Sequence, residues 1–318
     1  MFKFNTNKVY WNHPIGKGNF ASVYPYGKGQ SDSKWVVKWV NALNFDKVLK
    51  TVEQIIVGFN LEHPAILPIK GYKIEATKPK GWNIYTKLPR MATDLRKVIN
   101  NCIENNKMIP EKDIIQYLHT LVCGLEYLHD RRIPHMAIKP ENILLSSQGK
   151  VKLSDVSGVR VIETEHSFHT STEAVGTQAY IAPELLQEHQ GLKRRQLFMA
   201  DIWSLGAVIG ELMLLKRVSN DQEEGEIGKE LAQIEGKYSK GILDLVIDMV
   251  QGDATKRKTA SEIKKILEAD YGDLVGSSER IVQEVEEEFK EEDKGKYYLP
   301  SETSEEFSPK SPGFLVFF

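Results

Sequence analysis

Asn142 and Asp155 carry oxygen atoms of the kind that bind a hard metal ion. They lie 13 residues apart, and between them two short apolar runs, residues 143–145 and 151–153, predict a strand, a turn and a second strand. An amide oxygen and a carboxylate oxygen are ligands that a hard cation accepts. Two polar residues in ordinary loops are the alternative interpretation of the same pattern.

Two glycines near the N-terminus form a candidate phosphate site. Gly16 and Gly18 lie in the run 15–23, Ile-Gly-Lys-Gly-Asn-Phe-Ala-Ser-Val. Glycines let backbone amides approach a phosphate because no Cβ is in the way. Paired glycines also mark ordinary hairpins, and Lys38, which follows Trp-Val-Val, has the alternative role of a solvated lysine between buried valines. Each of these patterns alone is therefore a weak indication of a nucleotide site.

The secondary structure predicted around these residues changes from strands to helices along the chain. Residues 9–15, 21–26 and 34–40 are rich in β-branched and aromatic side chains and are separated by glycine-containing turns. This composition predicts a small antiparallel sheet. Apolar residues at helical spacing over 45–56 predict one helix, which ends before the His-Pro pair at 63–64.

Helices are predicted for most of the remaining chain. Residues 114–129 carry apolar side chains along one helical face, whereas residues 202–215 are apolar almost all round and are expected to be buried. A strand-rich lobe followed by a helical lobe is an α+β arrangement. We expect the two lobes to span about residues 1–90 and 91–276, within a single domain of residues 1–276.

Composition narrows the classes of partner and the compartment. The 318 residues are 41% hydrophobic and 27% charged, as in a globular protein, and the net charge of −2 gives no reason to expect nucleic acid as a partner. Cys102 and Cys123 lie in predicted helices without metal-ligand spacing, which favours the cytoplasm or the nucleus. We expect no membrane span and no signal peptide.

The segment 277–318 differs in composition from the chain before it. It contains 11 acidic and 5 basic residues. Apolar residues at helical spacing over 279–293 predict an amphipathic helix, and the prolines that follow predict an extended end. We interpret 277–318 as an acidic appendage to the domain.

The run 135–142, His-Met-Ala-Ile-Lys-Pro-Glu-Asn, resembles the catalytic loop of protein kinases, whose pattern is His-Arg-Asp-Leu-Lys-Pro-x-Asn. Residues 176–184, Gly-Thr-Gln-Ala-Tyr-Ile-Ala-Pro-Glu, resemble the end of a Ser/Thr kinase activation segment. Thr177 and Lys139 differ from the tyrosine kinase pattern. Through these motifs, the chain is identified as a member of the eukaryotic-type Ser/Thr protein kinases over roughly residues 9–270.

Two further motifs support this resemblance. Residues 201–206, Asp-Ile-Trp-Ser-Leu-Gly, resemble the start of the buried helix whose Asp anchors the catalytic loop, and Arg257 matches the ion-pair partner of Glu184. Small-molecule kinases generally lack these elements. The resemblance implies a two-lobed protein-kinase fold and protein substrates or a regulated partner protein; it implies no oligomeric state.

The resemblance also implies ATP and Mg²⁺ as cofactors. Asn142 and Asp155 match the two magnesium ligands, and Lys139 matches the residue that contacts the transferring phosphate. Lys38 matches the lysine that pairs with the α and β phosphates, and its usual glutamate partner falls on Gln54, next to Glu53. The residues that match the nucleotide-binding positions are Ile15, Gly16, Lys17, Gly18, Val23, Val36, Lys38, Leu88, Met91, Asp94 and Leu144.

Ala137 stands where the family has its proton-accepting Asp, so we expect phosphate transfer to be inactive or strongly impaired. Two explanations remain open. Wee-type kinases carry a His-Met-Asp version of this loop, so Met136 can be native and Ala137 an introduced substitution. Alternatively, Ala137 is natural and the chain is a pseudokinase that acts as a nucleotide-binding scaffold, in keeping with Gln54, Val156 and Ser157 at other altered positions.

Overall fold

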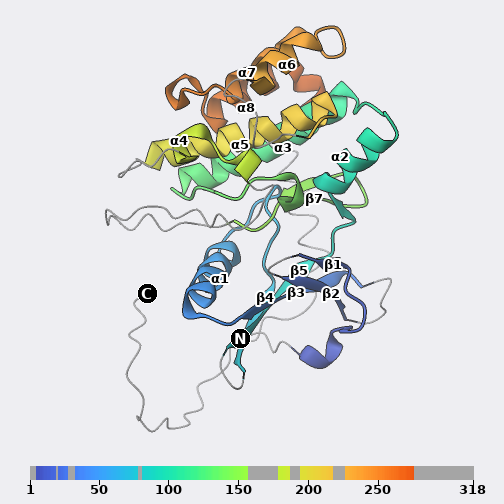
Figure 1. The fold of residues 1–318 in the computed structure, drawn as a ribbon, viewed down its shortest axis with the longest axis vertical. Coiled ribbons are helices and arrows are strands. Elements are labelled where there is room, and N and C mark those ends of the chain that lie inside the picture. The colour runs from blue at the N-terminus through green and yellow to red at the C-terminus, as the bar shows by residue number, and fades with distance from the viewer. Residues whose placement is uncertain are drawn as a thin grey trace.

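Figure 1 shows a lobe built around a β-sheet and a second lobe built from helices, joined through the middle of the chain. The computed structural model describes residues 5–18, 21–27, 33–77, 81–156, 178–186, 194–217 and 226–275. The segment 164–172, which is rich in serine and threonine, and the appendage 277–318 lie outside these residues. Within them, the predicted α+β architecture with two lobes is confirmed.

The first lobe contains an antiparallel sheet of five strands in the order β1-β2-β3-β5-β4. Its central strand, β3, is rich in valine and tryptophan, which suit a pleated, half-buried surface. Val37, Val40 and Ala42 of β3 are buried. The strands are β1 (Gly16–Lys17), β2 (Ser22–Tyr26), β3 (Trp35–Ala42), β4 (Gly71–Ala76) and β5 (Trp82–Pro89).

Helix α1 (Phe45–Phe59) covers one face of this sheet. It begins at Asn44, whose side-chain oxygen accepts a hydrogen bond from the Lys47 amide at 2.9 Å, as expected of an N-cap. Val48 and Ile55 of α1 join Val40, Ala42 and Ile84 of the sheet in one apolar cluster. The helix predicted over 45–56 is therefore present and extends to Phe59.

The strand predicted over 9–15 is wrong. Residue Val9 makes only an isolated bridge to Tyr26, and the first strand begins at Gly16. The amide of His13 donates to the carbonyl of Tyr10 at 3.1 Å, which turns the chain, and Pro14 has no amide hydrogen for a strand. Trp11, one of the aromatic residues that suggested a strand, instead packs edge-on against Tyr24, Trp39 and Tyr85 of the sheet.

The described residues contain eight α-helices, and seven of them lie in the second lobe. Their bounds are α2 (Leu95–Glu104), α3 (Glu111–Asp130), α4 (Pro183–Leu186), α5 (Arg194–Leu214), α6 (Glu226–Gln233), α7 (Lys240–Met249) and α8 (Ala260–Val275), after α1 in the first lobe. Among the described residues, only α5 is long and apolar enough to cross a membrane, but 83% of its most apolar window is buried within the fold. Helix α5 is therefore the core helix predicted from its uniform apolar pattern, and it begins at Arg194, before the predicted residue 202.

A small sheet lies where the two lobes meet. Its strands are β6 (Thr93–Asp94), β7 (Ile143–Leu145) and β8 (Val151–Leu153), in that order. The predicted strands at 143–145 and 151–153 are confirmed. The Leu153 amide donates to the Ala65 carbonyl at 2.7 Å and the Leu67 amide donates to the Leu153 carbonyl at 2.8 Å. These bonds tie β8 to the segment that follows α1.

A close approach at Gly206 gives a first prediction. A Cβ at this position of α5 would lie 2.7 Å from the Met249 Cβ and 2.9 Å from Val250 Cγ1. We expect Gly206→Ala to lower the free energy of unfolding by about 1–3 kcal/mol, because overpacking forces neighbouring side chains or backbone to move. Urea unfolding followed by circular dichroism measures this change.

Gly272→Ala in α8 is the matched control for this substitution. No atom lies within 4 Å of the Cβ that it would add. Alanine is a better helix former than glycine, so we expect this control to leave stability unchanged or to raise it by up to about 1 kcal/mol. Equal stability of the Gly206→Ala variant and the parent would contradict the close packing of α5 against α7.

Candidate active site

Lys38 and Asp155 form the ion pair at the centre of the candidate site. They are 117 residues apart in the sequence, yet Lys38 Nζ lies 2.5 Å from Asp155 Oδ1. Lys38 projects from β3, and Asp155 follows β8 with a φ of +58°, a left-handed conformation that aspartate tolerates better than most residues. The tertiary structure therefore brings together a cation and a carboxylate from different lobes.

The carboxyl group of Asp155 is ionised at neutral pH. Burial acts to raise its pKa, but the Lys38 ammonium outweighs this effect by charge and by a hydrogen bond, and the net shift is downward. Lys139 acts in the same direction. Positive charge from two segments thus surrounds this carboxylate.

The partner of Lys38 differs from the one suggested by the kinase pattern. Glu53 and Gln54 both lie in α1, where Glu53 is exposed and Gln54 is partly buried. Neither pairs with Lys38 in the described part of the chain, where the ion-pair partner of Lys38 is Asp155. A helix rotates by about 100° per residue, so one position of offset directs the carboxylate of Glu53 to another side of α1.

Asp201 holds the loop that contains Ala137. Its carboxylate accepts hydrogen bonds from the backbone amides of His135 at 2.7 Å and Met136 at 2.8 Å, and His129 Nε2 lies 2.9 Å from it. Asp201 is 2% exposed. Met136 has a φ of +59°, a conformation that is costly for a non-glycine residue and is stabilised by these bonds. The anchoring role implied for Asp201 is therefore present.

The loop conformation does not depend on the side chain at position 137. The Ala137 amide donates to His135 Nδ1 at 3.3 Å, and the Ala137 carbonyl accepts from Asn142 Nδ2 at 2.7 Å. Both bonds use backbone atoms of Ala137. A different side chain at 137 can therefore occupy the site while the loop keeps these contacts.

Ser154, which lies between β8 and Asp155, links Asp155 to Asn142 by hydrogen bonds. The amide and the hydroxyl of Ser154 both donate to the Asn142 carbonyl, at 2.9 Å and 3.1 Å. The side-chain amide nitrogen of Asn142 donates to the Ala137 carbonyl. The side-chain oxygen of Asn142 can therefore coordinate a metal ion. These hard oxygen donors fit Mg²⁺ when phosphates and water complete its coordination. Among the described residues, no group of three His, Cys, Asp or Glu residues could hold a metal on its own.

The glycines of the β1–β2 hairpin are not required by the fold. The Ile15 amide donates to the Val23 carbonyl at 2.8 Å, and the Gly18 amide donates to the Ala21 carbonyl at 2.9 Å. A Cβ at Gly16 or Gly18 would lie at least 3.6 Å from any neighbouring atom, which is ordinary contact. Neither glycine has a positive φ. The fold therefore leaves room for a side chain at 16 and at 18, and Lys17 between them is exposed.

Several residues at the predicted nucleotide-binding positions lie opposite one another on neighbouring strands. Val36 lies opposite Leu88, and Val23 lies opposite Lys38. Asp94 lies opposite Leu144 in the small sheet, and Met91 precedes this sheet. Asp94 also caps α2, because its carboxylate accepts from the Lys97 amide at 3.0 Å. This cap is a structural role that competes with the predicted ribose contact.

The predicted ion pair between Glu184 and Arg257 is present in the second lobe. Arg257 Nη1 and Nη2 lie 2.7 Å and 2.9 Å from the two carboxylate oxygens. The same guanidinium donates to the carbonyls of Gln251, Met199 and Gly252. Arg257 is 3% exposed, so this pair joins α4 to the core away from the candidate active site.

The sequence patterns did not identify Arg96, Tyr180 and Glu211, which form a polar network beside the candidate site. Arg96 Nη1 donates to Glu211 Oε1 at 2.5 Å, and Arg96 Nε donates to Glu141 Oε1 at 2.9 Å. Glu211 is 0% exposed. The available signal was Glu211 itself, because it lies in the mostly apolar second half of α5 and a buried acidic residue needs a partner.

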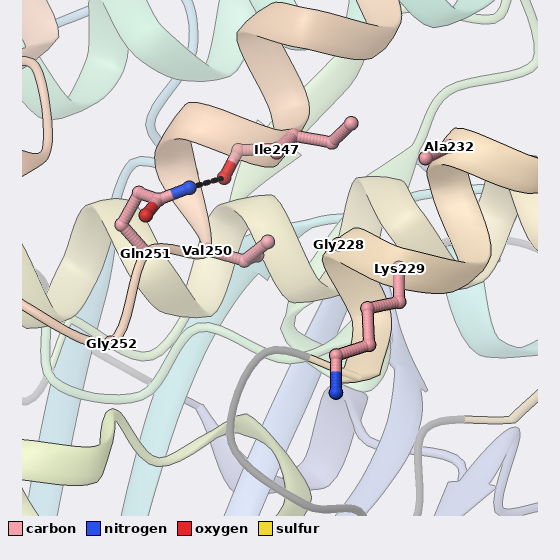
Figure 2. A pocket seen from close by; sticks show the side chains of 7 residues that line it. All are labelled: Gly228, Lys229, Ala232, Ile247, Val250, Gln251 and Gly252. Carbon is pink, nitrogen blue, oxygen red and sulfur yellow. Dashed lines mark hydrogen bonds between the residues drawn. The ribbon is translucent and has the colours of Figure 1, made fainter.

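Figure 2 shows a cavity that is separate from the candidate active site. Its volume is about 350 Å³, and it lies between α6 and the end of α7. The lining residues are Gly228, Lys229, Ala232, Ile247, Val250, Gln251 and Gly252. None of the predicted site residues lines this cavity.

Comparison with known proteins shows similarity to protein kinases. A family model described as a protein kinase domain matches residues 11–270. The chain is 28% identical over 262 residues to the serine/threonine-protein kinase Nek5 of Homo sapiens, and this match covers 79% of the chain and 35% of Nek5. It is also 28% identical over 262 residues to the CBL-interacting protein kinase 26 of Oryza sativa subsp. japonica, with 79% and 50% covered.

A shorter relative matches over most of its length. The chain is 27% identical over 256 residues to the serine/threonine-protein kinase Aurora-2 of Arabidopsis thaliana, and the match covers 77% of the chain and 83% of the relative. The chain spans half or less of the length of Nek5 and of the CBL-interacting protein kinase 26.

Proposed function

The chain belongs to the protein kinase family, and the relatives it resembles are serine/threonine kinases. We therefore propose that it binds Mg-ATP between its two lobes. ATP binding is expected for the family. The observation that carries the proposal is the ion pair between Lys38 and Asp155, because it places a phosphate-binding cation beside a metal-binding carboxylate.

Each predicted residue has a role in this proposal. The nucleotide base packs against Val36, Leu88, Met91 and Leu144, and the hairpin residues Ile15, Gly16, Lys17, Gly18 and Val23 cover the phosphates. Lys38 neutralises the phosphates, Lys139 approaches the transferring phosphate, and Asp94 lies near the ribose. Asn142 and Asp155 hold Mg²⁺, which supplies positive charge to the phosphate oxygens. These assignments agree with the strand register and with the charge around Asp155.

We propose that Ala137 impairs transfer of the γ-phosphate to a protein serine or threonine hydroxyl. Its methyl group accepts no proton, and a general base of this kind typically contributes ~10²–10⁴-fold in rate. The loop around Ala137 keeps its backbone hydrogen bonds. The proposed defect is therefore confined to proton transfer and to orientation of the attacking hydroxyl.

A natural pseudokinase that serves as a nucleotide-binding scaffold is the second candidate. The observation that favours it is that Lys38, among the described residues, forms its ion pair with Asp155 and not with α1, where Gln54 stands in place of the usual glutamate. In either case the proposed partner is a protein. Two buried free cysteines, Cys102 and Cys123, agree with a proposed location in the reducing cytoplasm or nucleus.

Asp155→Asn tests the proposed metal and nucleotide site. We expect the affinity for Mg-ATP to fall by about tenfold or more, because the substitution removes the ionised ligand but keeps its shape, and a contact to a charged group typically contributes about 1.5–3 kcal/mol. Isothermal titration calorimetry of the full chain with ATP and Mg²⁺ measures this affinity.

Asp248→Asn is the control for a change of charge alone. Asp248 lies in α7 and pairs with Lys258, and both side chains are more than a third exposed, so nucleotide affinity should stay unchanged. No binding of Mg-ATP to the parent chain, or equal affinity of the parent and the Asp155→Asn variant, would contradict the proposed site.

A further inference from the structure

Arg96 connects four separate elements of the second lobe. It lies in α2 and donates to Glu141 in the 3-10 turn Pro140–Asn142, to Glu211 in α5 and to the hydroxyl of Tyr180 in the 3-10 turn Gln178–Tyr180. The Tyr180 hydroxyl in turn donates to the second carboxylate oxygen of Glu211. One guanidinium therefore organises two carboxylates and a phenol.

The charge of Glu211 makes Arg96 necessary to this part of the fold. Glu211 is 0% exposed, and the Arg96 side chain is 15% exposed. A buried carboxylate is costly unless it is paired and hydrogen-bonded. Burial acts to lower the pKa of Arg96, but its bonds to Glu211 and Glu141 outweigh burial and hold the pKa above its ordinary value. Burial and Glu211 raise the pKa of Tyr180, so its hydroxyl remains a donor.

The network of Arg96, Tyr180, Glu211 and Glu141 is adjacent in sequence to the proposed magnesium ligand Asn142. Glu141 directly precedes Asn142 in the same 3-10 turn. Other hydrogen bonds hold Asn142 from the sides of Ala137 and Ser154. The ion pair between Arg96 and Glu141 holds this turn from the side of α2. Asn142 is thus fixed from three directions, and Arg96 supplies one of them.

We propose that Arg96 is a positioning residue for the binding of Mg-nucleotide, acting through Glu141 on the turn that carries Asn142. This inference rests on the proposed function, because it assigns a support to one of the proposed metal ligands. A guanidinium is required because its planar fork presents several donors in fixed directions. A lysine ammonium at this position reaches one of the three partners well and leaves the others unsatisfied.

The test compares Arg96→Lys with the double variant Arg96→Met and Glu211→Gln, each in the full chain. The double variant removes one cation and one buried anion together, which limits the loss of stability that an unpaired Glu211 would cause. The measured quantity is the Mg²⁺ concentration that gives half-maximal binding of a fluorescent ATP analogue. ATP-analogue affinity in EDTA is measured in parallel.

We expect both variants to need about tenfold more Mg²⁺, as is typical when a residue that supports a metal ligand is lost, while the affinity in EDTA stays within about twofold. Arg217→Met is the matched control, because Arg217 hydrogen-bonds Asn100 of the same helix at 2.9 Å without contacting Glu141. The control should match the parent in both measurements.

Three results distinguish a failure of the positioning role of Arg96 from a failure of the proposed Mg-nucleotide binding. An unchanged Mg²⁺ requirement in the double variant overturns the positioning role of Arg96. An equal loss of affinity with and without Mg²⁺ also overturns it, because Arg96 would then support only the fold. Failure of the parent chain to bind Mg-nucleotide at all refutes the proposed function itself.

Discussion

Replacing Ala137 with aspartate is expected to raise the rate of phosphate transfer by ~10²–10⁴-fold, which is the usual contribution of a general base. The new carboxylate would accept the proton of the attacking hydroxyl and orient that hydroxyl toward the phosphate. Transfer of labelled γ-phosphate from Mg-ATP to a mixture of serine- and threonine-containing peptides measures the rate.

The structure explains why one substitution should be sufficient. Asp201 anchors the backbone of His135 and Met136, and Asn142 bonds the carbonyl of residue 137. None of these contacts uses the Ala137 side chain. An aspartate at 137 therefore enters a loop that is already held in place, and Lys38, Asn142 and Asp155 need no rearrangement.

Two controls make this experiment decisive. Ala137→Asn has nearly the same size as Ala137→Asp but accepts no proton at neutral pH, so its rate should stay near that of the parent. Adding Asp155→Asn to Ala137→Asp should abolish the gain, which excludes activity from a contaminating kinase. A folded, Mg-ATP-binding Ala137→Asp variant that remains inactive would contradict the enzyme proposal and favour the scaffold.

Breaking the ion pair between Arg257 and Glu184 is expected to cause the largest loss of stability. Arg257→Leu should lower the free energy of unfolding by about 3–5 kcal/mol, as is typical when one partner of a buried pair is removed. The Glu184 side chain is 13% exposed and would lose both of its bonds. The carbonyls of Gln251, Met199 and Gly252 would lose a donor as well.

Urea unfolding at neutral pH measures this loss. Lys258→Ala is the matched control, because the adjacent Lys258 also forms an ion pair but is 36% exposed in its side chain and pairs with a partner that is 42% exposed. Surface pairs typically contribute about 0–1 kcal/mol, so the control should change little. If both variants lose the same free energy, the special role of Arg257 is wrong.

The double variant Arg257→Leu and Glu184→Leu distinguishes two costs: that of leaving the Glu184 carboxylate unpaired and that of losing the ion pair itself. Replacing a buried pair by apolar residues is often close to neutral. We expect the double variant to recover part of the stability lost by Arg257→Leu, although the three carbonyls remain without their donor. A further loss in the double variant would show that Glu184 stabilises α4 independently of Arg257.

Local patterns were sufficient to predict several of the helices and strands. Helical spacing of apolar residues predicted α1 and α3, and the apolar run that becomes α5 predicted a buried core helix. These predictions succeed because burial of an apolar face is encoded by residues close in the sequence. The strand predicted over 9–15 failed for a related reason: Trp11 packs on the face of the sheet, and composition alone does not distinguish this packing from a place in the sheet.

The residues available for chemistry could be read from local patterns: the run 135–142 resembles the protein kinase catalytic loop and has Ala137 where that pattern has Asp. How those residues meet depends on the packed fold. Lys38 pairs with Asp155 across 117 residues and not with α1, and Arg96 joins Glu141 to Glu211 and Tyr180. The physical reason is that charge pairing depends on distances of a few ångströms between side chains, and only the packed fold sets those distances.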